Sequence, residues 1–242
     1  GNASMSVFAA EFLGTMLLIL LGNGAVANVV LERTKGNNSG LIVIACGWAL
    51  AVFIGIATVG QYSGAHLNPA VTIGLASAGK LAPERIVIYL IAQCAGAALG
   101  ATLVWIHYRS HFPETADADA KLAVFCTAPA IRHTLNNVLS EIIGTAVLML
   151  VVLYKVSPDS GLGAVDALPV ALTVLAIGLS LGGTTGYAIN PARDLMPRLM
   201  HQLLPISGKR DSDWSYAWIP VVGPILGALL AVVIFKSLSA SP

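Results

Sequence analysis

Two copies of one three-residue motif, Asn68-Pro69-Ala70 and Asn190-Pro191-Ala192, decide the fold of this chain. Each motif stands near the start of a fairly apolar segment, residues 66–79 and 188–204. A helix needs roughly 20 residues to cross the ~30 Å of hydrocarbon in a bilayer, so neither segment is long enough to span it. Asparagine is a strong helix N-cap, and proline fits the next position because no N–H is needed there. The motifs therefore predict two short helices, each about half a membrane span long.

The composition places these half-helices in a membrane. The 242 residues are 56% hydrophobic and only 10% charged, and the mean hydropathy is +0.80. A soluble domain carries about 25% charged residues, so a water-facing surface is excluded. The net charge is +1 and the basic residues are scattered, which argues against binding to nucleic acid. The three cysteines form neither a disulfide framework nor a metal pattern, and we expect no metal or cofactor.

Six stretches are long and apolar enough to be membrane-spanning helices. They cover residues 7–30, 41–60, 85–105, 138–156, 167–181 and 217–235. The first is too long, and lacks the small-residue cleavage site, to be a signal peptide that is later removed. No linker or soluble domain remains, so residues 1–242 are predicted to form a single domain. The positive charges divide between the two sides and do not decide its orientation.

The two halves of the chain repeat each other. Residues 10–15, AEFLGT, correspond to residues 140–145, SEIIGT, and an offset of 130 relates Glu11 to Glu141. The Asn-Pro-Ala motifs are offset by 190 − 68 = 122, and the repeats cover about residues 6–106 and 136–236. Each half holds three spans, so the second half must enter from the opposite face. Interrupted helices at matching places of an inverted repeat indicate a transport site at the midplane.

The chemistry of the motifs suits a channel centre. The side-chain oxygen of Asn68 or Asn190 caps its helix, which leaves the NH₂ group free to donate to a passing oxygen. The positive ends of the two helix dipoles would face each other there, so water or a hydroxyl is accepted while cations and protons are disfavoured. Arg193 lies in the first turn of the second half-helix, where a cation opposes the dipole. We therefore interpret Arg193 as a donor that lines the pore, and Asp194 as a carboxylate that complements the dipole.

Over its full length the sequence resembles the aquaporin superfamily, also called the major intrinsic proteins. The resemblance rests on residues 64–72, GAHLNPAVT, and 186–194, GYAINPARD. It implies an all-α membrane protein with six transmembrane helices and two re-entrant half-helices around one pore per subunit, usually in a homotetramer. It also implies that Glu11 and Glu141 support the backbone that precedes each half-helix, together with Pro69, Ala70, Pro191 and Ala192. His66 is either a structural residue or part of an inner vestibule.

By resemblance, the narrow selectivity filter consists of Trp48, Gly178, Tyr187 and Arg193. Glycerol-conducting members have tryptophan, glycine and an aromatic residue with this arginine, whereas water-selective members usually have histidine at position 48 and a bulkier residue near 178. Two aromatic faces would contact the CH edge of a polyol while the arginine binds its hydroxyls. Four further positions resemble the glycerol facilitators: Asp194, Arg198, Pro220 and Val221.

Tyr187 departs from the pattern, because bacterial glycerol facilitators typically have phenylalanine there. The added hydroxyl is expected to make the filter narrower or more polar, and some related channels of lactic acid bacteria pass neutral lactic acid.

The sequence thus predicts a passive channel, not an enzyme, in the plasma membrane of a bacterial cell, surrounded by the lipid bilayer. Glycerol, other small neutral solutes and water are the expected permeants. The alternatives are a water-selective aquaporin or a channel mainly for neutral lactic acid, urea or hydrogen peroxide. An ion-coupled transporter also uses inverted repeats, but it needs titratable groups along its pathway. The deep candidates for that role are few: Glu11, Glu141 and the Arg193-Asp194 pair.

Overall fold

The computed structural model describes residues 4–155 and 163–239, and within these ranges every regular element is a helix. Six helical segments are long and apolar enough to cross a membrane, the third and the fifth being counted together with the short 3-10 turn before each. They are α1 (Val7–Val30), α2 (Leu41–Ser63), α4 (Ile86–His107), α6 (Thr134–Tyr154), α7 (Leu168–Leu181) and α9 (Ile219–Ser239). Short 3-10 turns, η1 (Pro83–Arg85) and η2 (Gly163–Ala167), precede α4 and α7.

The predicted spans agree with these helices to within a few residues at each end. The first prediction matches α1 at both ends. The second helix runs three residues beyond the predicted end, to Ser63, because Gly64 in the left-handed conformation terminates it. The predicted span 138–156 starts earlier, at Thr134, where the ring of His133 caps the helix. Residue 156 lies outside the described residues.

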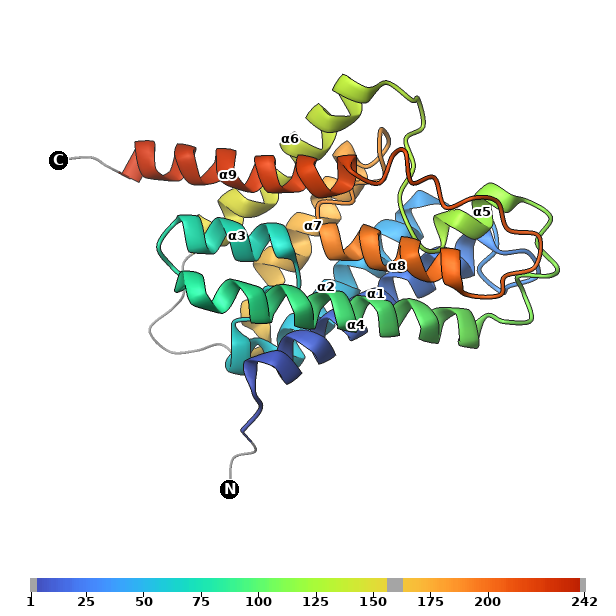
Figure 1. Ribbon diagram of the computed structural model, residues 1–242, viewed down its shortest axis with the longest axis horizontal. Coiled ribbons are helices and arrows are strands. Elements are labelled where there is room, and N and C mark those ends of the chain that lie inside the picture. Colours follow the sequence, from blue (N-terminus) through green and yellow to red (C-terminus); the bar gives the residue numbers. More distant parts are fainter. Residues whose placement is uncertain (1–3, 156–162, 240–242) are drawn as a thin grey trace.

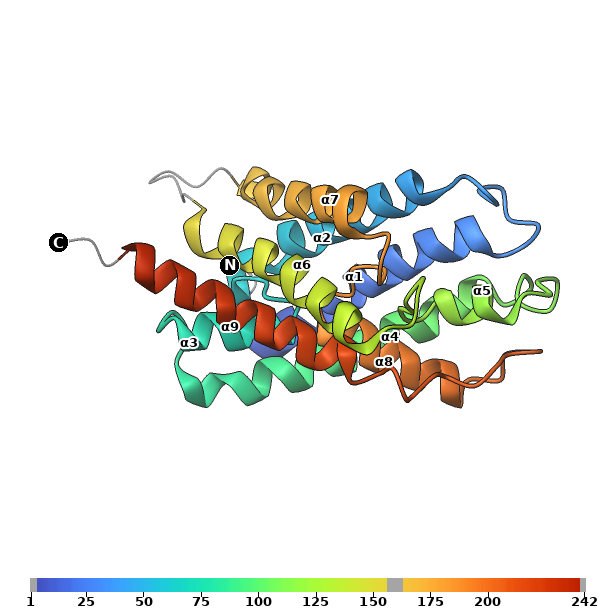
Figure 2. The ribbon, with the colours of Figure 1, turned by 90° about the horizontal axis from the view of Figure 1, so that it is seen from above.

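The inverted repeat is visible in the way the spans pack. In the first half α1 lies against α2 and α4, and in the second half α6 lies against α7 and α9 (Figures 1 and 2). Glycines make the closest of these contacts possible. A Cβ atom at Gly96 of α4 would lie 2.3 Å from the carbonyl oxygen of Phe12, and one at Gly227 of α9 would lie 2.4 Å from that of Ile142. The two pairs are therefore equivalent helix crossings at glycine seams.

The half-helices α3 (Pro69–Ser77) and α8 (Pro191–Leu203) start at the asparagine caps Asn68 and Asn190. They begin near the middle of the molecule and run toward opposite ends, as Figure 2 shows. The predicted segment 66–79 is longer than α3 because its first residues are not helical. A short helix that the sequence analysis did not predict, α5 (Ala118–Ala123), lies in the loop after α4, where Asp117 caps it.

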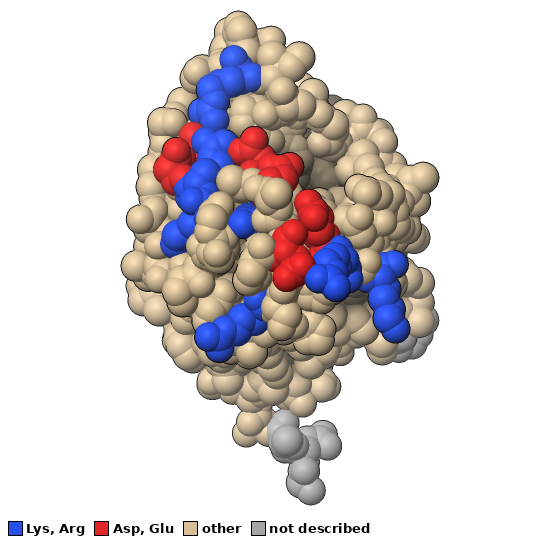
Figure 3. Space-filling model, turned by 90° about the vertical axis from the view of Figure 1, so that its right-hand side faces the viewer, with Lys and Arg blue, Asp and Glu red and all other residues tan. Residues whose placement is uncertain are grey.

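Charged side chains gather at the end of the molecule where α5 lies, opposite to the ends of α3 and α9 (Figures 1 and 3). Ion pairs cross between loops there: Arg33 with Glu114 and Arg210 with Asp119, at 2.6 and 2.5 Å, and Arg132 with Asp213. Burial raises the pKa of Asp213, but the hydrogen bonds from Arg132 and Ser215 and the nearby positive charges outweigh it, so that the pKa lies below its ordinary value. This end is held together by charge, whereas the spans are apolar.

Candidate functional site: a channel between the half-helices

The backbone before each half-helix has the same unusual conformation. Three residues have positive φ in each segment: Gly64, Ala65 and Leu67 before α3, and Gly186, Tyr187 and Ile189 before α8. The two sets correspond under the offset of 122, because 186 − 64, 187 − 65 and 189 − 67 all equal 122. A left-handed conformation costs a residue other than glycine about 1–2 kcal/mol, so something must hold these segments in place.

Two buried glutamates hold them. The carboxylate of Glu11 accepts hydrogen bonds from the backbone N–H groups of His66 and Leu67 at 2.9 and 2.8 Å. It also accepts one from the Ser63 hydroxyl at 2.6 Å and one from the Gln93 amide at 2.8 Å. Hydrogen bonds to a charged group contribute about 1.5–3 kcal/mol each, enough to offset the strained backbone.

In the second half, Glu141 accepts bonds from the N–H groups of Ala188 and Ile189 at 2.9 and 2.8 Å and from the Thr185 hydroxyl at 2.8 Å. Both glutamates are fully buried. Their geometry agrees with the supporting role expected for them.

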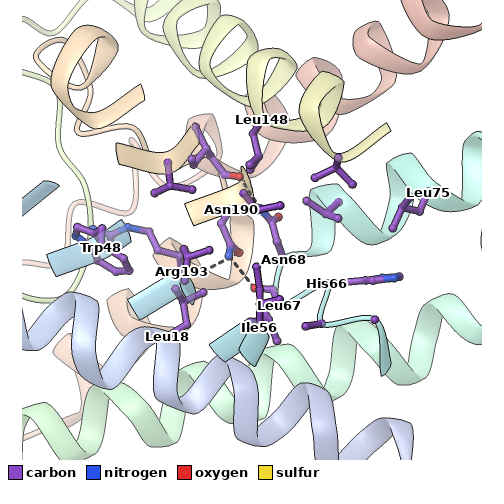
Figure 4. A pocket seen from close by; sticks show the side chains of 18 of the residues that line it. Leu18, Trp48, Ile56, His66, Leu67, Asn68, Leu75, Leu148, Asn190 and Arg193 are labelled. Carbon is purple, nitrogen blue, oxygen red and sulfur yellow. Dashed lines mark hydrogen bonds between the residues drawn. The ribbon is translucent and has the colours of Figure 1, made fainter. Parts of the chain in front are cut away.

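The two asparagines meet across the middle of the molecule. The Oδ1 atom of Asn68 accepts from the N–H of Ala70, and that of Asn190 accepts from Ala192 and Arg193, as the cap prediction requires. Their NH₂ groups are not fully free, however. Asn68 donates to the carbonyl oxygen of Ile189 at 2.7 Å, and Asn190 donates to that of Leu67 at 2.8 Å (Figure 4).

The expectation of a wholly free NH₂ group was therefore wrong. The carbonyl group just before the cap of each half-helix thus accepts a hydrogen bond from the asparagine that caps the other half-helix. An amide NH₂ group has two hydrogens, so one remains on each asparagine for a permeant.

A cavity of about 100 Å³ passes these asparagines. A single water needs only ~10–15 Å³ on this measure, so there is room for a file of waters or a small solute. The lining is mainly apolar, with the two asparagines, Arg193 and the backbone of both strained segments as its polar groups. Trp48 and Arg193 line the part of the cavity on the side of the charged end. His66 and Lys155 line the part near the opposite end. The cavity is thus a narrow apolar path with a few fixed hydrogen-bonding points.

Arg193 and Trp48 form a contact at one end of this path. The guanidinium carbon lies 4.3 Å from the centre of the Trp48 ring, and the two side chains are shown in Figure 4. Arg193 is 6% exposed and donates through Nη1 to the carbonyl oxygen of Phe125 at 3.3 Å. That carbonyl also accepts from the side chain of Asn23 at 3.4 Å. Because the guanidinium has five N–H donors, it can bind oxygen atoms in the channel while it keeps this contact.

The ring of Tyr187 lines the cavity and lies beside Gly178 of α7 and beside Gly182, which directly follows this helix. A Cβ atom at Gly178 would lie 2.9 Å from Cζ and 3.0 Å from the hydroxyl oxygen of Tyr187, and one at Gly182 would lie 2.6 Å from Cδ1. The hydroxyl is buried beside α7 without a hydrogen-bond partner among the described residues. This position beside Gly178 gives no support to the expectation that the hydroxyl makes the filter more polar.

Asp194 and Arg198 do more than complement a helix dipole. Both side chains are fully buried, and Arg198 Nη2 lies 2.8 Å from Asp194 Oδ1. The other carboxylate oxygen of Asp194 accepts from the backbone N–H and the hydroxyl of Thr127, both at 2.7 Å. Arg198 donates to the carbonyl oxygens of Thr127 and Ser212 at 2.8 Å. The pair therefore ties the loop that carries Phe125 to α8, and so it positions the partner of Arg193.

His66 lines the cavity and is also held by structural contacts, so both interpretations apply to it. Its ring is stacked on Tyr89 with centroids 4.4 Å apart, and Nδ1 lies 3.0 Å from the Thr72 hydroxyl. Pro220 and Val221 lie at the start of α9, and the described cavity lining does not include them. Gly178 leaves room for the ring of Tyr187, because a Cβ atom at this position would lie too close to it.

Sequence reasoning missed several residues that shape the site: Asn23, Gln93, Phe125 and Thr127. Phe125 and Thr127 act mainly through backbone groups, which any side chain would provide. Asn23 and Gln93 are polar residues inside apolar spans, and this signal could have identified them, because a buried amide needs partners.

Comparisons with known proteins agree with this geometry. The sequence model of the major intrinsic protein family matches residues 2–235. A protein of Thermotoga maritima named "probable glycerol uptake facilitator protein" is 56% identical over 232 residues, which cover 96% of this chain and 99% of the relative. A glycerol uptake facilitator protein of Streptococcus pneumoniae is 54% identical over 236 residues, with shares of 96% and 99%.

A solved structure shows the same fold. The aquaglyceroporin from Plasmodium falciparum superimposes with a TM-score of 0.84 at 32% identity, covering 96% of each chain. The chain therefore belongs to the major intrinsic protein family of membrane channels, which are not enzymes, and it is a multi-pass protein of the cell membrane, like its bacterial relatives.

Proposed function

We propose that the chain is a passive channel for glycerol and similar small neutral solutes, with water as a co-permeant. The observation that carries this proposal is the contact between Arg193 and Trp48 at one end of the cavity. A flat aromatic face beside a five-donor cation forms a slot with one apolar and one polar wall. A polyol has one edge of C–H groups and one of hydroxyls, so it fits both walls in a single orientation.

The filter consists of Trp48, Tyr187 and Arg193, with Gly178 leaving the space in which the tyrosine lies. Cations are repelled by Arg193 at this point and by the helix ends at Asn68 and Asn190 further in. The permeant therefore has to be neutral and small enough to pass in single file.

A water-selective channel is the main alternative. The residue type at position 48 distinguishes the two functions. A histidine at position 48 would add a second polar group to the filter beside Arg193. Tryptophan instead provides an apolar wall, which the passage of water does not require. Relatives named glycerol uptake facilitators and an aquaglyceroporin support the polyol channel. Neutral lactic acid and urea are further small, neutral candidates.

Stopped-flow light scattering on proteoliposomes tests the proposal. Inward gradients of glycerol, urea and lactic acid, the last at low and neutral pH, are compared with an osmotic gradient that only water can follow. We expect rapid re-swelling with glycerol that a proton uncoupler leaves unchanged. Water flux without glycerol flux would refute the polyol channel, and flux that follows a proton gradient would refute a passive mechanism.

Arg193→Val gives the filter the residue that stands at the equivalent place of α3. Loss of one charged donor to the polyol corresponds to about 1.5–3 kcal/mol, so glycerol permeability is expected to fall roughly 10- to 100-fold relative to water. An unchanged ratio of glycerol to water permeability would contradict the assigned filter.

The family fold further leads us to propose that residues 1–242 act as one channel domain in a homotetramer, with one pore in each subunit. Large apolar side chains that remain exposed on the spans, such as Ile42, Val87, Leu172 and Val233, would then face lipid or a neighbouring copy. Native mass spectrometry in detergent gives the copy number directly, and a monomer would contradict this part.

A further inference from the structure

Trp48 lies directly against a position that has no side chain. A Cβ atom placed on Gly22 of α1 would lie 2.2 Å from both Cε3 and Cζ3 of Trp48, and 2.6 Å from Cη2. Ordinary contacts of a Cβ atom begin near 3.4 Å, so the ring would have to move by about 3.4 − 2.2 = 1.2 Å. A tryptophan ring is rigid and cannot bend away, so the whole side chain must shift.

The ring has little room for such a shift. It is 5% exposed, and the guanidinium of Arg193 lies over it at 4.3 Å. A displacement of more than 1 Å therefore changes the width of the slot, the contact with Arg193, or both.

The inverted repeat provides an internal comparison for this position. The offset of 130 that relates Glu11 to Glu141 takes Gly22 to Val152, and the offset of 122 that relates Asn68 to Asn190 takes Trp48 to Val170. Val152 and Val170 both line the channel toward its other end. The second half thus has valine at both of these positions, whereas the first half has glycine where its partner position holds tryptophan.

We propose that Gly22 is a positioning residue of the filter: its missing side chain sets where the Trp48 ring stands and thereby the selectivity of the channel. This inference rests on the proposed filter. Gly22 itself does not touch the permeant in this assignment, because it acts through the tryptophan.

Gly22→Ala tests the inference, and Gly24→Ala is its matched control. Gly24 lies on the same helix two residues away, and a Cβ atom there would have no heavy atom within 4 Å. Both variants receive one methyl group at a helical glycine, so their helix propensities change equally. Glycerol and water permeabilities are measured by stopped-flow light scattering on proteoliposomes with matched protein content.

We expect Gly22→Ala to lower glycerol permeability by about tenfold, as overpacking at a tight contact does, while water permeability falls less than about threefold. Gly24→Ala should keep both permeabilities at the wild-type level. A wild-type ratio of glycerol to water permeability in Gly22→Ala would overturn the inference, as would an equal loss in Gly24→Ala. Wild-type protein that passes no glycerol would instead refute the proposed function.

A second pair of variants covers the case in which Gly22→Ala does not fold. Trp48→Phe has a smaller ring, so adding Gly22→Ala to it should change the glycerol to water ratio by less than about twofold. The variant Trp48→Phe alone provides the reference. If the methyl group lowers the ratio about tenfold relative to Trp48→Phe alone, Gly22 does not act through the tryptophan ring.

Discussion

The half-helices α3 and α8 start from the same arrangement and then differ within one turn. In each, an asparagine cap and a proline follow a strained segment that a buried glutamate holds. Two residues after the proline, α3 continues with Val71-Thr72 and α8 with Arg193-Asp194. Thr72 bonds neutral partners, including the amide of Gln93 at 3.0 Å, whereas Asp194 pairs with the buried cation of Arg198.

The comparison distinguishes features that occur in both halves of the channel from features that occur in only one half. Two helix ends must meet at the centre, so the frame that places them is repeated. A solute in single file has to be discriminated only once along its path, so a single arginine at one end is sufficient. The residues that differ between the halves therefore include the proposed filter arginine and the Asp194–Arg198 pair that supports it, whereas the repeated residues support both half-helices.

The largest effect is expected from breaking the asymmetric support. Asp194→Asn leaves the charge of Arg198 buried with a weakened partner, which is expected to lower the free energy of unfolding by about 3–5 kcal/mol. Thr72→Val, the matched change in α3, removes neutral hydrogen bonds that contribute about 1 kcal/mol each. Thermal unfolding in detergent, followed by size-exclusion chromatography, compares the two variants. Equal destabilisation would show that the two halves are supported alike.

A smaller effect is expected from weakening the symmetric frame. Glu11→Gln and Glu141→Gln each replace a carboxylate oxygen by an NH₂ group that points at backbone donors. Buried N–H groups then lose their acceptor, which is expected to lower the free energy of unfolding by about 1–3 kcal/mol. We expect Glu11→Gln to be the more destabilised of the two, because Glu11 accepts four hydrogen bonds and Glu141 three. The same unfolding assay, with glycerol flux as a second readout, checks the order. A reversed order would mean that the extra bond from Gln93 contributes nothing.

The smallest effect is expected at the tyrosine of the filter. Tyr187→Phe removes a hydroxyl that lies beside Gly178 and makes no hydrogen bond within the described structure. Glycerol and water permeabilities should each change by less than about twofold, since loss of an unpaired buried hydroxyl is nearly neutral. A large rise in glycerol flux would place the hydroxyl in the path of the solute and would contradict its assigned position beside Gly178.

The sequence was sufficient for the parts of this molecule that depend on periodicity, length and capping. Six spans, two half-helices and the repeat follow from apolar runs and from Asn-Pro-Ala, because these features are local. The resemblance then supplied the filter positions, which are far apart in the chain. It did not reveal that Ala65, Leu67, Tyr187 and Ile189 adopt left-handed backbone, since none of these residue types favours it.

The remaining features depend on contacts between distant segments, which no local pattern encodes. The carbonyl of Phe125 meets Arg193 only because Asp194 and Arg198 draw its loop onto α8. Likewise, the need for glycine at position 22 becomes clear only from its close contact with the Trp48 ring, which lies on another helix.

The exchange of hydrogen bonds between the two asparagines also has a consequence for biosynthesis. Asn68 finds its acceptor 121 residues later in the chain, and Leu67 finds its donor 123 residues later. At 5–20 residues per second, a ribosome needs roughly 6–25 s to make that length. During this interval the first half can insert its spans, yet the amide of Asn68 and the carbonyl of Leu67 have no partners. The channel centre is therefore one of the last parts to form, and a product truncated after the first repeat would present these groups unpaired at the middle of the bilayer.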